Sequence, residues 1–201
     1  GSTFEDIQKT INIANDNDII VLNGTYKSTG YHIFVNKSIT ITCKYMYGAT
    51  LDANKKYRAL YIVSDNVVLK NLKIINGKLK NRQGPPNILD HGYGGAICWE
   101  GNNGTMIDLT IENNEIYGGW HGESSAIYWK GLNGTIIHTL FFNNTGNDDL
   151  GLNQRYTFLK GIVHGVYTGD LYDNNPSKSA IFYRVVVNSK GHLTANNLSI
   201  N

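Results

Sequence analysis

The chain has 201 residues, with 18 lysines and arginines against 16 aspartates and glutamates, which gives a net charge of +2 at pH 7. This length is enough for one domain with a hydrophobic core, and the absence of a basic block excludes an electrostatic nucleic-acid binder. No apolar run reaches the ~18 residues that a membrane-spanning helix needs, so this segment is not expected to insert into a membrane. The many glycines and tyrosines, 22 and 13, predict strands and turns.

The first element is the one helix that the sequence predicts, at residues 3–14. Thr3 can cap it, and Glu5 and Asp6 stand in the first turn, where the helix dipole favours anions. Residues 1–2, Gly-Ser, are interpreted as the remnant of an expression tag. A helix here would cover the open end of a stacked fold. Its apolar side chains fall on one face: Phe4, Ile7, Ile11 and Ala14.

Short strand patterns follow the helix, with apolar residues at every second position and Asn, Gly, Asp or Lys in the turns. In order, they read IIVLNGTY, HIFVN, SITITC, ATLDA, ALYIV and VVLKNLKII. No helical run of about 10 residues joins them, although parallel strands normally need a crossover helix. A repeat of short strands and tight turns, stacked on itself, removes that need.

An internal repeat supports this interpretation. Residues 95–114, GAICWEGNNGTMIDLTIENN, recur at 125–144 as SAIYWKGLNGTIIHTLFFNN, with ten of twenty positions identical. The sequence therefore predicts an all-β parallel β-helix, or solenoid, over residues 3–201. In the expected register, Ile107 and Ile137 point into the core, so an aspartate at either position would unfold the domain.

Other segments join the repeat at different offsets. ALYI and LKIIN, at 59–62 and 72–76, match it at a spacing of 37, and AIFY at 180–183 resumes it. The excursions at 77–94 and 146–179 and the short link at 115–124 all leave from one point of the repeat. Because equivalent points of stacked coils lie above one another, these three loops should gather at one edge, as binding loops do.

Asparagines recur at two positions of the repeat. Asn76, Asn113 and Asn143 share one position, and Asn114 and Asn144 share the next. Asparagine tolerates left-handed backbone angles, and its amide can bond to the coils above and below. We therefore predict an asparagine ladder at a corner of the coil rather than a ligand site.

The segments TFEDIQKTINIANDNDIIVLNGTY, NKSITITCKYMYGATLDA and VVLKNLKIINGK resemble the adhesin-like proteins of methanogenic archaea. Those proteins carry right-handed, single-stranded parallel β-helices of the pectate-lyase-like, NosD-like type. The GGAI…NN units are similar to the repeat of chlamydial polymorphic surface proteins. The resemblance implies a right-handed β-helix with an N-terminal capping helix, in an extracellular, cell-surface setting. It leaves the activity open, because one solenoid serves lyases, hydrolases, epimerases and adhesins.

Histidines mark the predicted loop edge. His91 and His121 are thirty residues apart and precede GAI and SAI, so stacked coils would bring their rings within one strand spacing, ~4.8 Å. His164 begins a third His-Gly pair. Imidazoles beside a carboxylate can bind a metal or move protons, but no metal-binding motif is present, so no metal or cofactor is predicted. The candidate binding residues are His91, Tyr117, Trp120, His121, Glu123, His164 and Tyr172.

The repeat also pairs Trp99 with Trp129, and Cys98 with Tyr128. Because side chains alternate along a strand, one pair points inward and the other outward. The isoleucine two positions before each tryptophan favours a core position for the tryptophans; facing outward, they would form an aromatic strip for sugar rings. Cys43 lies on a different face of the coil from Cys98, so two free thiols are expected.

Catalytic patterns are sparse. A polysaccharide lyase would need a carboxylate cluster for Ca²⁺ and a base, and no such cluster recurs on the strands. The isolated acids read as turn or solvent-facing residues: Asp52, Asp65 and Asp108. A glycosidase pair could come only from loop acids, Glu123 with Asp170 or Asp173.

Three functions therefore stay open. The favoured one is an adhesin-like domain that binds a glycan or a partner cell surface through its loop edge. The alternatives are a carbohydrate-active lyase or hydrolase, and a passive spacer. Because the chain stops at Asn201 inside a strand pattern, we expect a longer native protein, and self-association through the uncapped end. Should residues 146–179 fold back over the last coil, they would cap it instead.

Overall fold

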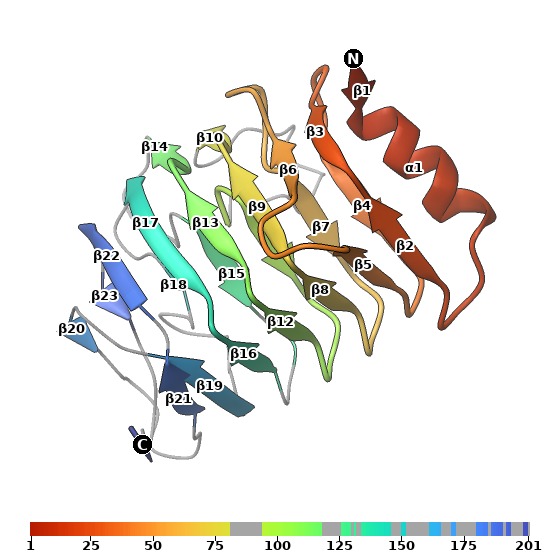
Figure 1. Cartoon of the computed structure of the whole chain (residues 1–201). Coiled ribbons are helices and arrows are strands. Elements are labelled where there is room, and N and C mark those ends of the chain that lie inside the picture. The colour runs from red at the N-terminus through yellow and green to blue at the C-terminus, as the bar shows by residue number, and fades with distance from the viewer. Residues whose placement is uncertain are drawn as a thin grey trace, which may run out of the picture.

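The computed structural model describes residues 1–80, 94–117, 126–129, 131 and 134–145. For residues 80, 117 and 145 it describes the backbone alone, as it does for the later strand residues 150–151, 161–165, 170–171, 180–184, 186–190, 192–193 and 199–200. One helix, α1 (Phe4–Ile13), precedes the coils. The strands form three sheets, in which each strand lies beside its counterpart from the neighbouring coil (Figure 1).

Sheet A contains, in spatial order, β1 (Ser2–Thr3), β3 (Gly24–Lys27), β6 (Ala49–Asp52), β9 (Leu72–Ile75), β13 (Thr110–Glu112), β17 (Leu140–Thr145), β14 (Glu115–Tyr117) and β10 (Lys78–Lys80), with β22 (Val186–Lys190) also paired to β17. Sheet B contains β2 (Ile19–Leu22), β5 (Thr40–Cys43), β8 (Val68–Lys70), β12 (Thr105–Ile107), β16 (Thr135–Ile137), β19 (Gly161–Gly165), β21 (Ala180–Arg184) and β24 (Ser199–Ile200). Sheet C contains β20 (Asp170–Leu171), β23 (His192–Leu193), β18 (Leu150–Gly151), β15 (Ile127–Trp129), β11 (Ile97–Trp99), β7 (Leu60–Ile62) and β4 (Ile33–Val35).

From β2 to β9 the chain visits sheets B, A and C in turn, so its next strand in the same sheet comes a full coil later. β2, β3 and β4 form the first coil, and β5, β6 and β7 stack on them in parallel. This path needs no crossover helix. The register reproduces both sequence spacings, because Ile97 lies beside Ile127 and also beside Leu60. The predicted all-β parallel solenoid with an N-terminal helix is confirmed.

The core runs along the inside of the three sheets. In sheet B the inward side chains include Met106 and Ile136, both fully buried, whereas Ile107 and Ile137 are only partly buried. The prediction that Ile107 and Ile137 point inward is therefore wrong by one residue. Strict alternation backwards from β13 would place Ile107 inward, but Asp108 has a φ of 53°, in the left-handed region. The corner at this residue resets the alternation between β12 and β13.

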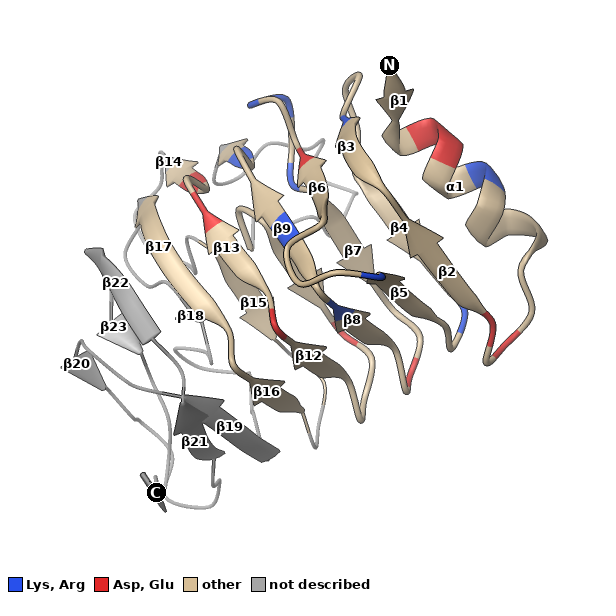
Figure 2. Ribbon diagram, viewed as in Figure 1, with Lys and Arg blue, Asp and Glu red and all other residues tan. Residues whose placement is uncertain are grey.

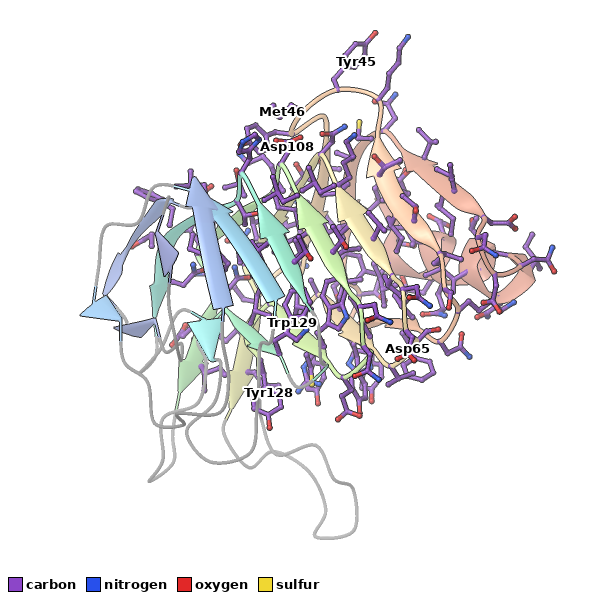
Figure 3. The ribbon with its side chains drawn as sticks, turned by 90° about the horizontal axis from the view of Figure 1, so that it is seen from below. Tyr45, Met46, Asp65, Asp108, Tyr128 and Trp129 are labelled. Atoms are coloured by element: carbon purple, nitrogen blue, oxygen red, sulfur yellow. The ribbon has the colours of Figure 1, made fainter. Side chains whose placement is uncertain are left out.

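Two stacked tryptophans fill the core under sheet C. The rings of Trp99 and Trp129 lie 4.3 Å apart between centroids with an interplanar angle of 5°, and both are fully buried. Figure 3 shows Trp129 inside the coil and Tyr128, one residue earlier, outside it. The predicted core position of the tryptophans is confirmed. Cys43 and Cys98 are both buried and are not joined in a disulfide, as expected.

A repeated glycine lets the coils approach closely beside this stack. A Cβ atom on Gly131 would lie 1.7 Å from the carbonyl oxygen of Gly101, and one on Gly101 would lie 1.8 Å from the carbonyl oxygen of Ser64. Any side chain at these positions would therefore push adjacent coils apart. This close packing accounts for glycine at both copies of the repeat position.

The asparagine ladder is present at one corner of the coil. The residues at its outer position adopt left-handed φ angles of 51° to 58°: Asn76, Asn113 and Asn143. The Nδ2 of Asn143 donates to Oδ1 of Asn113 at 2.5 Å. At the buried position, Nδ2 of Asn114 donates to Oδ1 of Asn144 at 2.9 Å, and Oδ1 of Asn114 accepts the backbone N–H of Gly77 at 2.8 Å. The predicted ladder is confirmed.

Asp52 extends this ladder towards the first coils. Its Oδ1 accepts the Nδ2 of Asn76 at 2.9 Å and the backbone N–H of Asn54 at 2.8 Å, and the residue is buried. The prediction of a turn or solvent-facing Asp52 is thus wrong, because the residue ends strand β6 and its buried carboxylate accepts these two hydrogen bonds. Asp65 and Asp108 do lie in turns between strands.

Helix α1 covers the first coil (Figure 1). Thr3 caps it through a capping box with Asp6, and the predicted apolar face is buried: Phe4, Ile7, Ile11 and Ala14. The amide of Gln8 binds strand β4 twice, since Nε2 donates to the carbonyl of Phe34 at 3.1 Å and Oε1 accepts its N–H at 2.7 Å. The predicted capping helix is confirmed. Nothing helical among the described residues has the length and apolarity to cross a bilayer.

The capping box predicts a pH-dependent contribution to stability. The backbone N–H and hydroxyl of Thr3 both donate to the Asp6 carboxylate, which lowers the pKa of Asp6. Because the folded-state pKa is depressed, this stabilisation is complete above the ordinary carboxylate pKa and disappears as the pH falls through the folded-state value. We expect Asp6→Asn to lower the melting temperature at pH 7, and the difference from wild type to shrink towards pH ~3. Thermal unfolding followed by circular dichroism measures this, and a pH-independent difference would contradict it.

The two long excursions are described only in part. Within 77–94, β10 pairs with β14, and within 146–179 the backbones of β18 and β19 continue sheets C and B beyond β15 and β16. The predicted cap at residues 146–179 lies mostly outside the described residues, so it stays a prediction. The domain limits and the continuation of the chain beyond them stay predictions.

Candidate functional site

The residues predicted to form the loop-edge site are mostly outside the part of the chain that the structure describes: His91, Trp120, His121, Glu123 and Tyr172. Tyr117 and His164 are described by their backbones, which pair with Lys80 in sheet A and Tyr183 in sheet B. A shared site of these side chains therefore stays a prediction.

The described residues carry a different candidate, on the outer face of sheet C. Each of its strands β4, β7, β11 and β15 is a triplet whose first and third residues are buried in the core, so that the middle side chain points outward. The strand register places these middle residues side by side in one row: Phe34, Tyr61, Cys98 and Tyr128. The row is partly exposed at Phe34 and Tyr61 and buried at Cys98 and Tyr128.

More aromatic rings extend this row at the exposed end. Tyr31, which is 61% exposed, stacks on Tyr57 with centroids 5.2 Å apart and an interplanar angle of 13°. His32 lies between them and the row, 4.1 Å from the Tyr31 ring and 5.4 Å from the Tyr61 ring. The ring centroids of Phe34 and Tyr61 are 5.8 Å apart. We call the five residues Tyr31, His32, Phe34, Tyr57 and Tyr61 the aromatic cluster.

Charged groups lie within and beside the aromatic cluster. The guanidinium of Arg58, a residue that is only 1% exposed, lies 5.3 Å from the ring centroid of Tyr57 and 5.6 Å from that of Tyr61. These distances allow cation–π contacts. The carboxylate of Glu100, at the end of β11, is hydrogen-bonded to the Tyr61 hydroxyl.

Burial, followed by the negative charge of Glu100, raises the pKa of Tyr61 well above its usual value. Its hydroxyl therefore remains protonated at physiological pH and donates its hydrogen bond to Glu100. The cluster thus combines flat aromatic faces with one fixed cation and one fixed anion. Aromatic faces with a few oriented polar groups are suited to sugar rings, whose C–H faces stack on aromatic side chains while hydroxyls bind polar groups.

Metal chemistry has no support in this part of the chain. No group of three or more His, Cys, Asp or Glu side chains that could hold an ion is found among the described residues.

Sequence reasoning missed the aromatic cluster, because its members come from separate coils and do not share a motif. Tyr31 and His32 precede β4, whereas Tyr57 and Arg58 precede β7. The available signal was the alternation itself. Once the tryptophans are assigned to the core, Cys98, Tyr128 and their equivalents Phe34 and Tyr61 must face outward.

Comparisons with known proteins give one structural neighbour to report. No protein-family model and no curated protein matches the sequence. Among solved structures, the chain is similar to that of a PL6 alginate lyase in complex with a trisaccharide, with a TM-score of 0.47 and 18% sequence identity. The match covers 89% of this chain and 33% of the lyase chain, so the present chain spans about a third of that enzyme's length. The strand pairing of the present chain identifies the chain as a parallel β-solenoid with an N-terminal helix.

Proposed function

We propose that this domain binds a carbohydrate chain along the outer face of sheet C. The observation that carries the proposal is the aromatic cluster, in which four rings of Tyr and Phe and one imidazole gather from two adjacent coils. Their outermost member, Tyr31, presents an exposed ring stacked on Tyr57. Large aromatic rings are normally buried, so a gathered and partly exposed set is typical of a binding surface.

The polar groups of the site suit a hydroxylated ligand. Glu100 is partly exposed and can accept hydrogen bonds from sugar hydroxyls in addition to the one from Tyr61. Arg58 is buried behind the rings, where its guanidinium contacts Tyr57 and Tyr61 and adds no basic surface that a ligand could reach. A site of this composition favours a neutral or weakly charged saccharide over a polyanion that would need several exposed cations.

The proposal is compatible with the predicted loop edge. In the sequence, His91 and His121 stand six residues before β11 and β15, so the segments that carry them lead into sheet C. We propose an adhesin-like role in an extracellular setting, in which these segments contribute to the same binding surface. That role and setting are inferred from the resemblance of the sequence and the chemistry of the face.

Catalysis on the bound carbohydrate is the second candidate function. The observation that favours it is that the buried His32 and the partly exposed Glu100 both lie beside Tyr61, because these are groups that can transfer protons. Because its raised pKa keeps Tyr61 protonated, that residue would not act as a base, and His32 or Glu100 would have to. A lyase or hydrolase would release products from a polysaccharide, whereas an adhesin would bind the polysaccharide and leave it intact.

The binding proposal predicts a loss of affinity when the exposed rings are removed. We expect Tyr31→Ala and Tyr57→Ala each to weaken binding by about tenfold, because a stacked aromatic ring contributes ~1 kcal/mol or more beyond its buried area. A glycan array identifies the ligand, and calorimetry with the best glycan measures the dissociation constants. Tyr45→Ala is the matched control, because Tyr45 is 66% exposed but lies in the loop between β5 and β6, outside the cluster.

The outcomes separate the three functions. Equal losses in Tyr45→Ala and Tyr57→Ala would place the binding surface elsewhere. The appearance of new reducing ends from a polysaccharide, abolished by Glu100→Gln, would support the enzyme. A domain that neither binds any glycan nor releases any product would be a spacer, and the carbohydrate proposal would be wrong.

A further inference from the structure

At the end of the solenoid beside α1, sheet B ends in a four-residue strand whose outer edge is open, whereas the edge strand of sheet A has two residues. Sheet A ends in β1, which pairs with β3, and sheet C ends in β4, whose Phe34 N–H and C=O are bound by the Gln8 amide. Sheet B ends in β2, which pairs with β5 and with no other described strand. An unprotected strand edge is a template for pairing with another chain, and native proteins usually cover or charge it.

The backbone of β2 shows which groups face the open side. The N–H of Thr40 in β5 donates to the carbonyl of Asp18, and Thr40 lies in register with Ile19. In a parallel pair, alternate residues direct both their N–H and their C=O to the same side. Since Asp18 and Ile20 face β5, the N–H and C=O groups of Ile19 and Val21 face away from it.

The side chains along this edge are apolar and exposed. Ile19 and Val21 are 65% and 63% exposed, and Ile13 at the end of α1 is 83% exposed. A groove of about 520 Å³ runs between α1 and β2, lined by all four residues of β2 and by α1 residues that include Ile7, Thr10 and Ile13. An exposed apolar edge beside a groove is a feature that soluble proteins normally avoid.

The negative charge around the groove indicates which kind of strand could pair with β2. Asp6 and Asp18 line it, and no lysine or arginine does. Figure 2 shows acidic residues on the first turn of α1 and in the turn that leads to β2. Two copies of this chain paired edge to edge through β2 would bring these carboxylates together, which disfavours self-association. A strand with basic residues at its ends would instead complement them.

We propose that the open edge of β2 binds an extended segment of a partner protein as an added strand. Its apolar side chains would pack beside Ile13, Ile19 and Val21, its backbone would pair with the amide groups of Ile19 and Val21, and flanking lysines or arginines would approach Asp6 and Asp18. Backbone pairing supplies the affinity in this mode of recognition, and the side-chain and charge pattern supplies the specificity. The site is independent of the carbohydrate face, which lies on sheet C.

Synthetic peptides test the proposal. The probes are acetylated, amidated seven-residue peptides with alternating Val-Thr, Ile-Thr or Val-Tyr cores, each flanked by lysines, serines or glutamates. We expect lysine-flanked peptides to bind with dissociation constants of about 10–100 µM, and glutamate-flanked ones at least about tenfold more weakly. Methylating the backbone nitrogens of every second residue should abolish binding in one of the two possible sets and leave it in the other, because only one edge of the added strand pairs with β2.

A protein variant tests the same hydrogen bonds from the other side. Val21→Pro removes an N–H that points away from β5, so the native ladder keeps its bonds, and peptide affinity should fall at least about tenfold. Val21→Thr, which keeps this N–H, is the control and should retain most of the binding. If Val21→Pro fails to fold, the methylated peptides decide the question alone. The proposal is overturned if no peptide of the panel binds below about 1 mM, if both methylated sets bind equally, or if sedimentation shows a dimer that Val21→Pro dissociates.

Discussion

Replacing Ile136 by aspartate is expected to unfold the domain, whereas the same change at Ile137 should leave it folded. Ile136 is fully buried in the middle of β16, between Met106 of one coil and the backbone of Val163 of the next. A carboxylate there would be an unpaired charge inside the stack, with a cost of several kcal/mol, which is comparable to the whole stability of a domain of this size. Ile137 is partly exposed on the outer face of sheet B, where water can solvate the new charge.

Urea unfolding of the two variants, followed by far-ultraviolet circular dichroism, measures this difference. Wild type and Ile137→Asp should unfold in one cooperative transition, and Ile136→Asp should lack strand signal without denaturant. The pair is closely matched, since the substitutions are identical and adjacent. His138, the counterpart of Asp108 in the repeat, also has a left-handed φ, of 49°. Equal destabilisation of the two variants would show that this corner does not reset the alternation of inward and outward side chains between β16 and β17.

Replacing Asn114 by alanine should cost about 3 kcal/mol of unfolding free energy, because each buried polar group left without a partner costs roughly 1–3 kcal/mol. The side chain is fully buried and joins three coils. Its Oδ1 accepts the N–H of Gly77, and its Nδ2 donates to Oδ1 of Asn144, to the carbonyl of Ile74 at 3.3 Å and to that of Glu112 at 3.1 Å. Alanine would remove the partner of the buried Gly77 N–H, together with the side-chain hydrogen bonds to Asn144, Ile74 and Glu112.

Asn113→Gly provides the control for this prediction. Asn113 is the preceding residue, partly exposed, with a φ of 57° that glycine adopts without strain. It should change the unfolding free energy by less than about 1 kcal/mol, because its ladder bond to Asn143 is exposed. Chemical denaturation of both variants gives the two values. A loss in Asn113→Gly as large as in Asn114→Ala would assign the stability to the backbone turn rather than to the buried amide.

The sequence alone determined the architecture, because local patterns and the repeat act over short distances. The ten identities between 95–114 and 125–144 predicted stacked coils, and the structure pairs those segments in that register. The same holds for the capping helix, whose face from Phe4 to Ala14 is buried, and for the asparagine ladder. Each of these depends on residues that are neighbours in the sequence or equivalent in the repeat.

The corner geometry was decided only by the tertiary structure. A run such as TMIDLTI has apolar residues on both sides of Asp108, and only the left-handed φ of that residue shows that the inward side chain is Met106 rather than Ile107. Asp52 was misread for a related reason, since its partners Asn54 and Asn76 lie across a turn and one coil away.

The two candidate binding surfaces likewise required the tertiary structure. The aromatic cluster joins residues in and before β4 with residues in and before β7, and no spacing in the sequence places Tyr31 on Tyr57. The open edge of β2 depends on where α1 lies, and on Gln8 binding the edge of sheet C instead. Coil stacking converts separations of roughly one repeat into direct contact, and side chains that carry no shared motif become a surface only after that stacking has occurred.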